Sequence, residues 1–520
     1  MNGAESLIRT MAGNGIDVCF ANPGTSEMHF VAALDRVDGI RCVLALFEGV
    51  ATGAADGYGR MLDRPASTLL HLGPGLANGL SNLHNAIRAF SPIVNIIGDH
   101  ATWHRHLDAP LTSDIEGAAR PFSHWVRTTP NANRVAEDGA AAIAAARAAP
   151  GCVASLILPG DAAWDDVTVP LPNDGCVPMP FVAQRARPKD EAIAAAAGIL
   201  RSGEPTAIIL AGQATREATL HVAGKIAGKT GAQLMTPSLT ARVTTGAGRV
   251  PVTRIPYAWS LAVEAFRDIR NIILIGGKAP VGFFAYPGKP SEYFQPGTRV
   301  FTLARAEDDI AYTLDALADA VGATRLKPYV SPLSLPELPH GDITPEKLGA
   351  LIAALLPENA IVVDESVSTG RNFIALAQTA KPHDWLLPTG GSIGYGMPVA
   401  AGCAIACPDR KVICLESDGS GMYMPQTLWT MAREGLDILT LIFANRKYQI
   451  LRNEMANVGV SNIGPKASAL LDIDNPTIDW VSQARTFGVA AWRAETVDEL
   501  ARHMTASLAE KGPRLIEVVM

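Results

Sequence analysis

The sequence predicts an α/β fold made of three doubly wound parallel-sheet domains. Short apolar runs alternate with Ala-rich helical patterns along all 520 residues, which is typical of parallel sheets covered by helices on both faces. Two stretches break this alternation, the charged FVAQRARPKDE at 181–191 and the Pro-rich VSPLSLPELPHGDITPE at 330–346. Such compositions are typical of inter-domain linkers. The predicted domains are therefore 1–180, 190–330 and 344–520.

The strand candidates are short runs rich in Val, Ile and Leu. The second linker leads into DITPEKLGALIAALL, where Asp342 or Thr344 can cap a helix and Pro345 suits its first turn. The candidates lie at 18–22, 42–46, 67–72, 93–99, 154–160, 207–212, 271–277, 360–366, 411–417, 439–445 and 514–520.

Composition excludes several classes of protein. The formal net charge is −7, and no Lys/Arg cluster is present to neutralise phosphates, so nucleic acid is not expected as a partner. The N-terminus lacks the apolar core of a signal peptide, and no stretch has membrane-spanning length, so we expect no membrane partner and a cytoplasmic location. The seven cysteines are odd in number and lack CxxC spacing, which favours buried thiols.

Polar residues end two apolar runs of the third predicted domain. Asp418, Gly419 and Ser420 follow one run, and Asn445 follows the next, with a helix-sized segment between them. Ligands bind at the carboxyl ends of parallel strands. Carboxylate and amide oxygens beside small residues that expose backbone form a site for a hard cation and a phosphate.

The first domain carries two further motifs. Glu48 follows a strand and enters an Ala/Gly-rich helix; it either satisfies free amides at the helix N-terminus or hydrogen-bonds a ring nitrogen of a bound heterocycle. His71 begins HLGPGLANG, a Gly-rich turn without a Walker Gly-Lys-Ser/Thr. This turn is either a tight strand–helix connection or a floor for a ligand ring, with His71 as a proton donor or acceptor.

Together these motifs resemble the thiamine-diphosphate enzyme superfamily, in its benzoylformate-decarboxylase and acetohydroxyacid-synthase branch. The usual Gly-Asp-Gly-Ser and Asn-Asn patterns are altered here by Ser417 and Ala444, while Asp418 and Asn445 remain. The motifs occur in the order FEGVATGAADGYGR, HLGPGLANG, TGGSIGYGMP, SDGS and AN.

The resemblance implies a cofactor site with thiamine diphosphate and Mg²⁺. The metal ligands would be Asp418, Asn445 and the carbonyl of Lys447. Glu48 would come from a partner subunit and protonate the pyrimidine ring, so a homodimer is required and a homotetramer is expected. The carbonyl of Gly391 would orient the exocyclic amine. The implied cofactor-binding residues are Glu48, Ser368, Gly391, Ser392, Ile393, Asp418, Gly419, Ser420, Asn445 and Tyr448.

The resemblance also bears on the reaction, whose substrate it implies is a 2-oxo acid. His71 matches the active-site histidine of benzoylformate decarboxylase, and Thr25 stands where that enzyme has a serine that contacts the substrate carboxylate. Its second histidine would fall within 279–288, which contains none. With one proton donor missing, acetolactate-synthase-like carboligation after decarboxylation is the predicted function. Benzoylformate-type decarboxylation and 2-hydroxyacyl cleavage are the alternatives.

Other interpretations stay open. The synthase's Phe-Gln pair and acceptor-selecting Trp have no counterpart here. The middle domain could hold FAD as a structural remnant, but it lacks the GxGxxG of a dinucleotide-binding oxidoreductase. The presence of Glu48, Asp418 and Asn445 argues against a non-catalytic paralogue. Three histidines with H-x3-H-x-H spacing suit a metal, an active-site rim or an interface: His100, His104 and His106.

Overall fold

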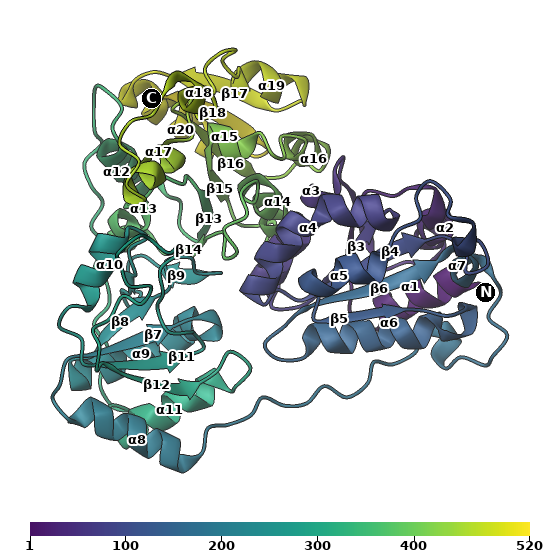
Figure 1. Cartoon of the computed structure of the whole chain (residues 1–520), viewed down its shortest axis with the longest axis horizontal. Coiled ribbons are helices and arrows are strands. Elements are labelled where there is room, and N and C mark those ends of the chain that lie inside the picture. Colours follow the sequence, from purple (N-terminus) through teal and green to yellow (C-terminus); the bar gives the residue numbers. More distant parts are fainter.

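The computed structural model describes residues 1–520, apart from the side chain of residue 173. It consists of three α/β lobes, each with its own largely parallel sheet (Figure 1), which confirms the predicted fold class. The N-terminal sheet is entirely parallel. In spatial order its strands are β2 (Arg41–Leu44), β1 (Val18–Ala21), β3 (Ala66–Leu70), β4 (Ile93–Asp99), β6 (Val153–Pro159) and β5 (Trp125–Thr128).

Helices cover both faces of the N-terminal sheet. One face packs against α1 (Gly3–Gly13) and α6 (Ala132–Arg147). The other packs against α3 (Glu48–Leu62) and α4 (Leu72–Ala89). The shorter helices of this lobe are α2 (Met28–Arg36), α5 (Ile115–Ala119) and α7 (Gly160–Trp164).

The middle lobe has a five-stranded parallel sheet. Its helices are α8 (Asp190–Arg201), α9 (Glu217–Thr230), α10 (Trp259–Phe266) and α11 (Ile310–Ala320). Its strands, in spatial order, are β10 (Thr253–Arg254), β8 (Gln233–Thr236), β7 (Thr206–Leu210), β11 (Asn271–Ile275) and β12 (Arg299–Ala304).

The C-terminal sheet contains one strand from outside its own segment. Strand β9 (Val243–Thr245), from the middle segment, pairs antiparallel with the edge strand β14 (His383–Leu386), so the middle segment is joined to the C-terminal lobe by a shared sheet. The order is β17 (Ala490–Ala494), β18 (Arg514–Val519), β16 (Ile438–Ala444), β15 (Val412–Ser417), β13 (Ala360–Glu365), β14 and β9.

Helices cover both faces of this sheet as well. Those that position the site are α15 (Asp418–Gly421) and α17 (Gln449–Asn457). The cap predicted after the second linker is confirmed, because Thr344 accepts a hydrogen bond from the amide of Lys347 and Pro345 is the first helical residue. The other helices are α12 (Pro345–Leu355), α13 (Phe373–Leu376), α14 (Gly396–Ala406), α16 (Thr427–Arg433), α18 (Pro465–Ala469), α19 (Trp480–Thr486) and α20 (Val497–Ala509).

The N-terminal and C-terminal lobes share a hydrophobic core in which α3 packs against α14. Small residues make this approach close. A Cβ on Gly57 would lie 2.2 Å from the carbonyl oxygen of Val399, and one on Gly402 would lie 1.9 Å from that of Ala54. The Ala/Gly-rich composition of both helices is therefore explained by backbone-to-backbone contact.

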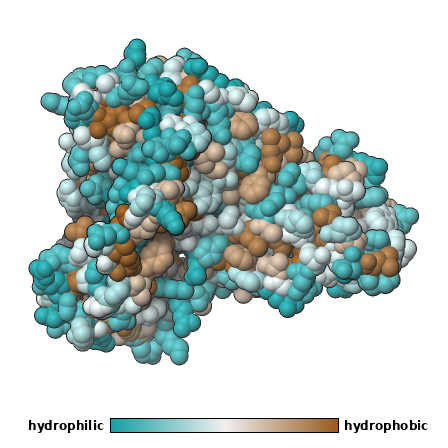
Figure 2. All heavy atoms as spheres, turned by 45° about the horizontal axis from the view of Figure 1, so that its top comes forward, coloured by the Kyte–Doolittle hydropathy of each residue, from teal (hydrophilic) through white to brown (hydrophobic). Residues whose placement is uncertain are grey.

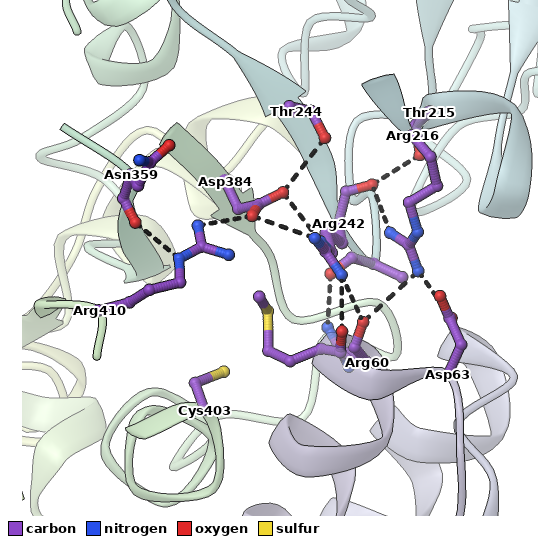
Figure 3. Close-up of polar contacts among 12 residues, drawn as sticks. Arg60, Asp63, Thr215, Arg216, Arg242, Thr244, Asn359, Asp384, Cys403 and Arg410 are labelled. Atoms are coloured by element: carbon purple, nitrogen blue, oxygen red, sulfur yellow. Dashed lines mark hydrogen bonds and ion pairs between the residues drawn. The ribbon is translucent and has the colours of Figure 1, made fainter. Parts of the chain in front are cut away.

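A network of arginines joins all three lobes (Figure 3). Arg60 on α3 forms a buried ion pair with Asp56 at 2.6 Å and donates to the carbonyl of Leu387 at 2.8 Å. Arg242 of the middle segment donates to the carbonyl of Arg60 at 3.2 Å and pairs with Asp384 on β14. The lobes are thus fixed to one another by charged hydrogen bonds as well as by the apolar core.

Both linker predictions fall on segments without regular structure, at residues 176–189 and 324–341. The first is the long extended connection between the N-terminal and middle lobes in Figure 1. The face in Figure 2 is largely hydrophilic, with apolar residues in separate small groups. Among the described residues, no helix combines the length and apolarity needed to cross a membrane.

Candidate active site

The two polar strand ends singled out in the sequence lie side by side. Strands β15 and β16 are parallel neighbours with Ser417 opposite Phe443, so Asp418 and Asn445 leave the sheet at the same edge. The Asp418 carboxylate accepts hydrogen bonds from the amides of Gly419 at 2.9 Å and Arg446 at 2.6 Å. These bonds hold the carboxylate at the mouth of a small pocket.

This pocket, of about 50 Å³, is lined by residues from several loops. Burial raises the pKa of Asp418 to about 6, although the amides of Arg446 and Gly419 oppose that shift. A buried carboxylate that retains free oxygen lone pairs is suited to a bound metal ion. The predicted site residues that the structure brings together here are Ser368, Ile393, Asp418, Gly419, Ser420, Asn445, Lys447 and Tyr448.

Gly419 allows an aromatic ring to close one side of the pocket. A Cβ at this position would lie 2.6 Å from the ring of Tyr448, so a larger residue would displace the tyrosine. Gly419 therefore exposes its backbone in the pocket wall, and exposed backbone amides are groups that phosphates approach closely.

A second cavity, of about 300 Å³, adjoins the first and has Gly391 and Ile393 in its wall. Gly391 has a φ of +71°, which glycine adopts without strain, and a Cβ there would lie 2.6 Å from the ring of Phe283. Asn85 on α4 fixes the same loop, since its side chain donates to the carbonyl of Ser392 at 2.8 Å and accepts from the amide of Gly390 at 3.1 Å. Ser392 thus contacts the N-terminal lobe and does not line either pocket.

Two buried carboxyl groups lie beneath these pockets. Glu365 ends β13 and accepts a hydrogen bond from the amide of Gly396 at 2.6 Å, at the start of α14. Burial raises the pKa of Glu365 to about 8. Burial, and then the charge of Glu365, raise the pKa of Glu416 well above its ordinary value. The pair therefore shares at least one proton at neutral pH, as two close carboxyls do.

Glu48 lies in the N-terminal lobe, at the start of α3. The residue is 6% exposed, and its carboxylate accepts a hydrogen bond from the side-chain Nδ2 of Asn78 at 3.0 Å. The pocket around Asp418, in contrast, is lined by residues of 367–450 alone. Within one chain, Glu48 and the Asp418 pocket therefore belong to different lobes.

His71 directly precedes α4 and is held by a buried acid that the sequence reasoning did not single out. Its Nδ1 lies 2.8 Å from Glu27 Oε2 and 3.3 Å from Ser26 Oγ, and Glu27 is 3% exposed. Thr25 is exposed, so Ser26, its neighbour, is the hydroxyl residue that contacts His71. The sequence signal for Glu27 is weak, a lone acid three residues after Gly24.

Other candidate residues lie apart from these pockets. The rings of His100 and His104 are 5.4 Å apart, and among the described residues no group of three or more His, Cys, Asp or Glu side chains could hold a metal. All seven cysteines are free. The expectation of buried thiols is confirmed for Cys19, Cys403 and Cys414, whereas three others are half-buried and Cys42 is exposed. A four-residue strand at the edge of its sheet leaves this side chain uncovered.

Comparison with known proteins identifies related sequences. The family model for "Thiamine pyrophosphate enzyme, N-terminal TPP binding domain" matches residues 1–120, and that for the "C-terminal TPP binding domain" matches residues 368–518. The chain is 49% identical to the "Putative acetolactate synthase large subunit IlvX" of Mycobacterium tuberculosis, over 100% of this chain and 99% of that one. It is 30% identical to the benzoylformate decarboxylase of Pseudomonas aeruginosa, over 97% and 96%.

Among solved structures, the thiamine diphosphate-dependent 4-hydroxybenzoylformate decarboxylase of Rhodococcus jostii RHA1 superposes with a TM-score of 0.86. That match covers 100% of this chain and 99% of the other, at 24% identity. It extends the similarity in fold to all three lobes.

Proposed function

Because the chain belongs to the family of thiamine pyrophosphate enzymes, we propose that it binds thiamine diphosphate with Mg²⁺ and acts on 2-oxo acids. The proposed reaction is decarboxylation followed by carboligation, as in acetolactate synthases. The observation that carries this proposal is the pair of adjoining pockets, one with Asp418 and Asn445 and the other with Gly391 and Ile393.

The residues present fit the diphosphate and its cation. Asp418 offers carboxylate oxygens that retain lone pairs beyond its two amide bonds, and Asn445 and the carbonyl of Lys447 add neutral oxygens. Mg²⁺ prefers one or two carboxylates together with substrate phosphates. Ser368 and Ser420 line the same pocket. The hydroxyl of Ser368 would donate to phosphate oxygens, whereas that of Ser420 already donates to Glu416.

The remaining residues would hold the rest of the cofactor, which would supply a nucleophilic carbon and an electron sink for decarboxylation. The Gly391 carbonyl would accept a hydrogen bond from the exocyclic amine. Ile393 would hold the bend between the two rings. Glu48 would hydrogen-bond the pyrimidine nitrogen and so position a proton there.

His71 would move a proton at the substrate. Glu27 accepts from Nδ1–H, which fixes the tautomer and leaves Nε2 to give or take the proton. The counterpart segment for a second histidine, 279–288, contributes Phe283 and Phe284 to the cavity wall and contains no histidine. With one proton-transfer group rather than two, protonation of the decarboxylated substrate would be slow. Its addition to the carbonyl of a second molecule would then compete well, which favours carboligation. The ordered His71–Glu27 pair supports simple decarboxylation as the second candidate.

We further propose that the working unit is a homodimer, with higher assembly to a tetramer. Asp418 is the one acid among the described residues that line its pocket, and a second copy of the chain could supply Glu48. Two-fold dimers are the commonest closed homo-oligomers.

Incubation of the full chain with thiamine diphosphate, Mg²⁺ and a panel of 2-oxo acids tests the proposal, with products identified by NMR. A 2-hydroxy ketone supports carboligation, and an aldehyde supports the second candidate. Glu48→Gln is the matched control and should abolish either product. Absence of any product from the unmodified chain, despite bound cofactor, would overturn the proposal.

A further inference from the structure

The cavity beside Gly391 and Ile393 contains two arginines that the proposed reaction does not use. Arg371 follows Gly370 in the loop after β13, and Arg254 ends β10 of the middle lobe. Both line this cavity of about 300 Å³, and both also line a neighbouring cavity of about 550 Å³. They therefore stand where the two cavities meet, next to the proposed cofactor site.

Neither guanidinium is matched by a carboxylate. Arg254 donates to the backbone carbonyl of Arg371 at 2.5 Å, and the Arg371 guanidinium carbon lies 4.1 Å from the ring centroid of Tyr257. Among the described side chains, no ion pair within 4.0 Å involves either arginine. Burial lowers the pKa of both groups, the direction expected when a cation is withdrawn from water without a close anion.

The acidic groups of the cavity bind other partners and do not pair directly with either arginine. Glu454 is the acid opposite, and it already accepts a hydrogen bond from Tyr286 at 2.6 Å. Asp364 is satisfied by Trp385 Nε1 at 3.1 Å and by the amide of Ser366 at 3.0 Å. Glu365 is buried and shares a proton with Glu416, and Tyr257 has a pKa raised by burial to about 12, so it stays neutral. The two arginines therefore share this cavity wall with the half-buried Glu454 and the buried Asp364. Both acids are hydrogen-bonded elsewhere, and neither forms an ion pair with Arg254 or Arg371 within 4.0 Å.

We propose that the substrate is a 2-oxo acid with a second carboxylate at its far end, and that Arg371 and Arg254 bind this second carboxylate. This inference rests on the proposed function. Guanidinium groups bind carboxylates through paired, charge-assisted hydrogen bonds. The 2-oxo group of such a molecule would lie toward Ile393, and its chain would pass the apolar wall of Phe283 and Phe284. A cavity of this size suits a chain of several carbons.

Two matched pairs of 2-oxo acids test the proposal: 2-oxoglutarate against 2-oxopentanoate, and 2-oxoadipate against 2-oxohexanoate. We expect kcat/KM to be roughly 10- to 100-fold higher for the dicarboxylate of each pair. In Arg371→Met the preference should fall through a raised KM for dicarboxylates, with monocarboxylates little affected. Arg371→Lys should be intermediate, because it keeps the charge but loses the planar fork. The exposed Arg325 gives the control Arg325→Met, which should keep the full preference.

Calorimetry separates this proposal from the proposed reaction, because it needs no turnover. Glutarate should bind the full chain at least 10-fold more tightly than pentanoate, and Arg254→Met and Arg371→Met should each remove most of that difference. This result would support the site even if no 2-oxo acid were consumed. Equal binding of the two acids, no binding of either, or a preference that survives both substitutions would overturn it.

Discussion

Arg242 and Asp384 form a bidentate ion pair that ties the middle segment to the C-terminal lobe. Arg242 Nε lies 2.8 Å from Oδ1 and Nη2 lies 3.1 Å from Oδ2. Arg410 donates to the same carboxylate at 2.7 Å, and Arg242 reaches the N-terminal lobe through the carbonyls of Arg60 and Met61. A single carboxylate thus anchors the junction of all three lobes (Figure 3).

We expect Asp384→Asn to lower the free energy of unfolding by about 3–5 kcal/mol, because loss of one partner leaves two guanidiniums without their counter-charge. Thermal and urea denaturation measure this change. Asp268, which is exposed, gives the control Asp268→Asn, which should leave stability unchanged.

Asp384→Asn should also change how the stability of the fold depends on pH in acid. Burial raises the pKa of Asp384, but Arg242 and then Arg410 outweigh burial and hold it below its ordinary value of 3.8. A carboxyl group with a lowered folded-state pKa stabilises the fold above its unfolded pKa, and this contribution is lost as pH falls through the folded value. Below about pH 4 the unmodified chain should therefore lose stability more steeply than Asp384→Asn. Equal slopes would contradict the ion pair's role.

Close packing of α3 against α14 gives a prediction about a glycine. Gly402→Ala would place Cβ 1.9 Å from the carbonyl oxygen of Ala54, so the two helices must separate, and we expect a loss of about 1–3 kcal/mol in unfolding free energy. Gly198 in α8 has no neighbour within 4 Å of such a Cβ. Gly198→Ala should instead stabilise by about 0.5–1 kcal/mol through helix propensity. Denaturant unfolding of both variants distinguishes steric cost from propensity.

Much of the fold followed from apolar runs, because buried parallel strands are uniformly hydrophobic. The run at 93–99 matches β4 (Ile93–Asp99) residue for residue, and the others shift by a residue or two at their ends. Strand β14 was missed because His383 and Asp384 interrupt its apolar pattern. Its polar residues are satisfied by Arg242 and Arg410 from distant segments, which no local pattern reveals.

The candidate site was predictable where its residues follow strands in sequence, as Asp418 and Asn445 do. Glu27, Arg254 and Arg371 act through tertiary contacts with residues far away in the chain. Arg254 meets Arg371 across 117 residues, so only the folded structure brings these two cations to one cavity.

Contact between His71 and Glu27 leads to a kinetic prediction. Glu27→Gln replaces a carboxylate that orders the imidazole with a neutral amide, and we expect kcat to fall by roughly 10- to 100-fold with little change in KM. The exposed Glu191 provides the control Glu191→Gln, which should behave like the unmodified chain. Steady-state kinetics with the best 2-oxo acid measures the effect. A change confined to KM would instead assign Glu27 to substrate binding.

The buried pair of Glu365 and Glu416 predicts how stability depends on pH. Burial raises the pKa of Glu365 from 4.5 to about 8, so the folded chain binds this proton more tightly than the unfolded chain. Stability should therefore fall as pH rises from about 4.5 to 8, by up to about 1.4 kcal/mol per pH unit. Glu365→Gln keeps the shape without the ionisation and should have a flatter profile in urea unfolding. A profile as steep as that of the unmodified chain would show that another group causes the slope.

Separation of Glu48 from the Asp418 pocket predicts complementation between chains. Glu48→Gln and Asp418→Asn should each be inactive as pure assemblies, because every site then lacks either the acid or the metal ligand. Co-expression of the two variants with different tags, followed by tandem purification, gives mixed dimers.

If each site combines Glu48 of one subunit with Asp418 of the other, a mixed dimer has one intact site and one doubly altered site, and activity returns. If both residues of a site come from the same chain, every site keeps one defect and the mixed dimer stays inactive. Mixed dimers of Glu48→Gln with unmodified chain, purified in the same way, control for the effect of tagging and give the activity expected from one intact site.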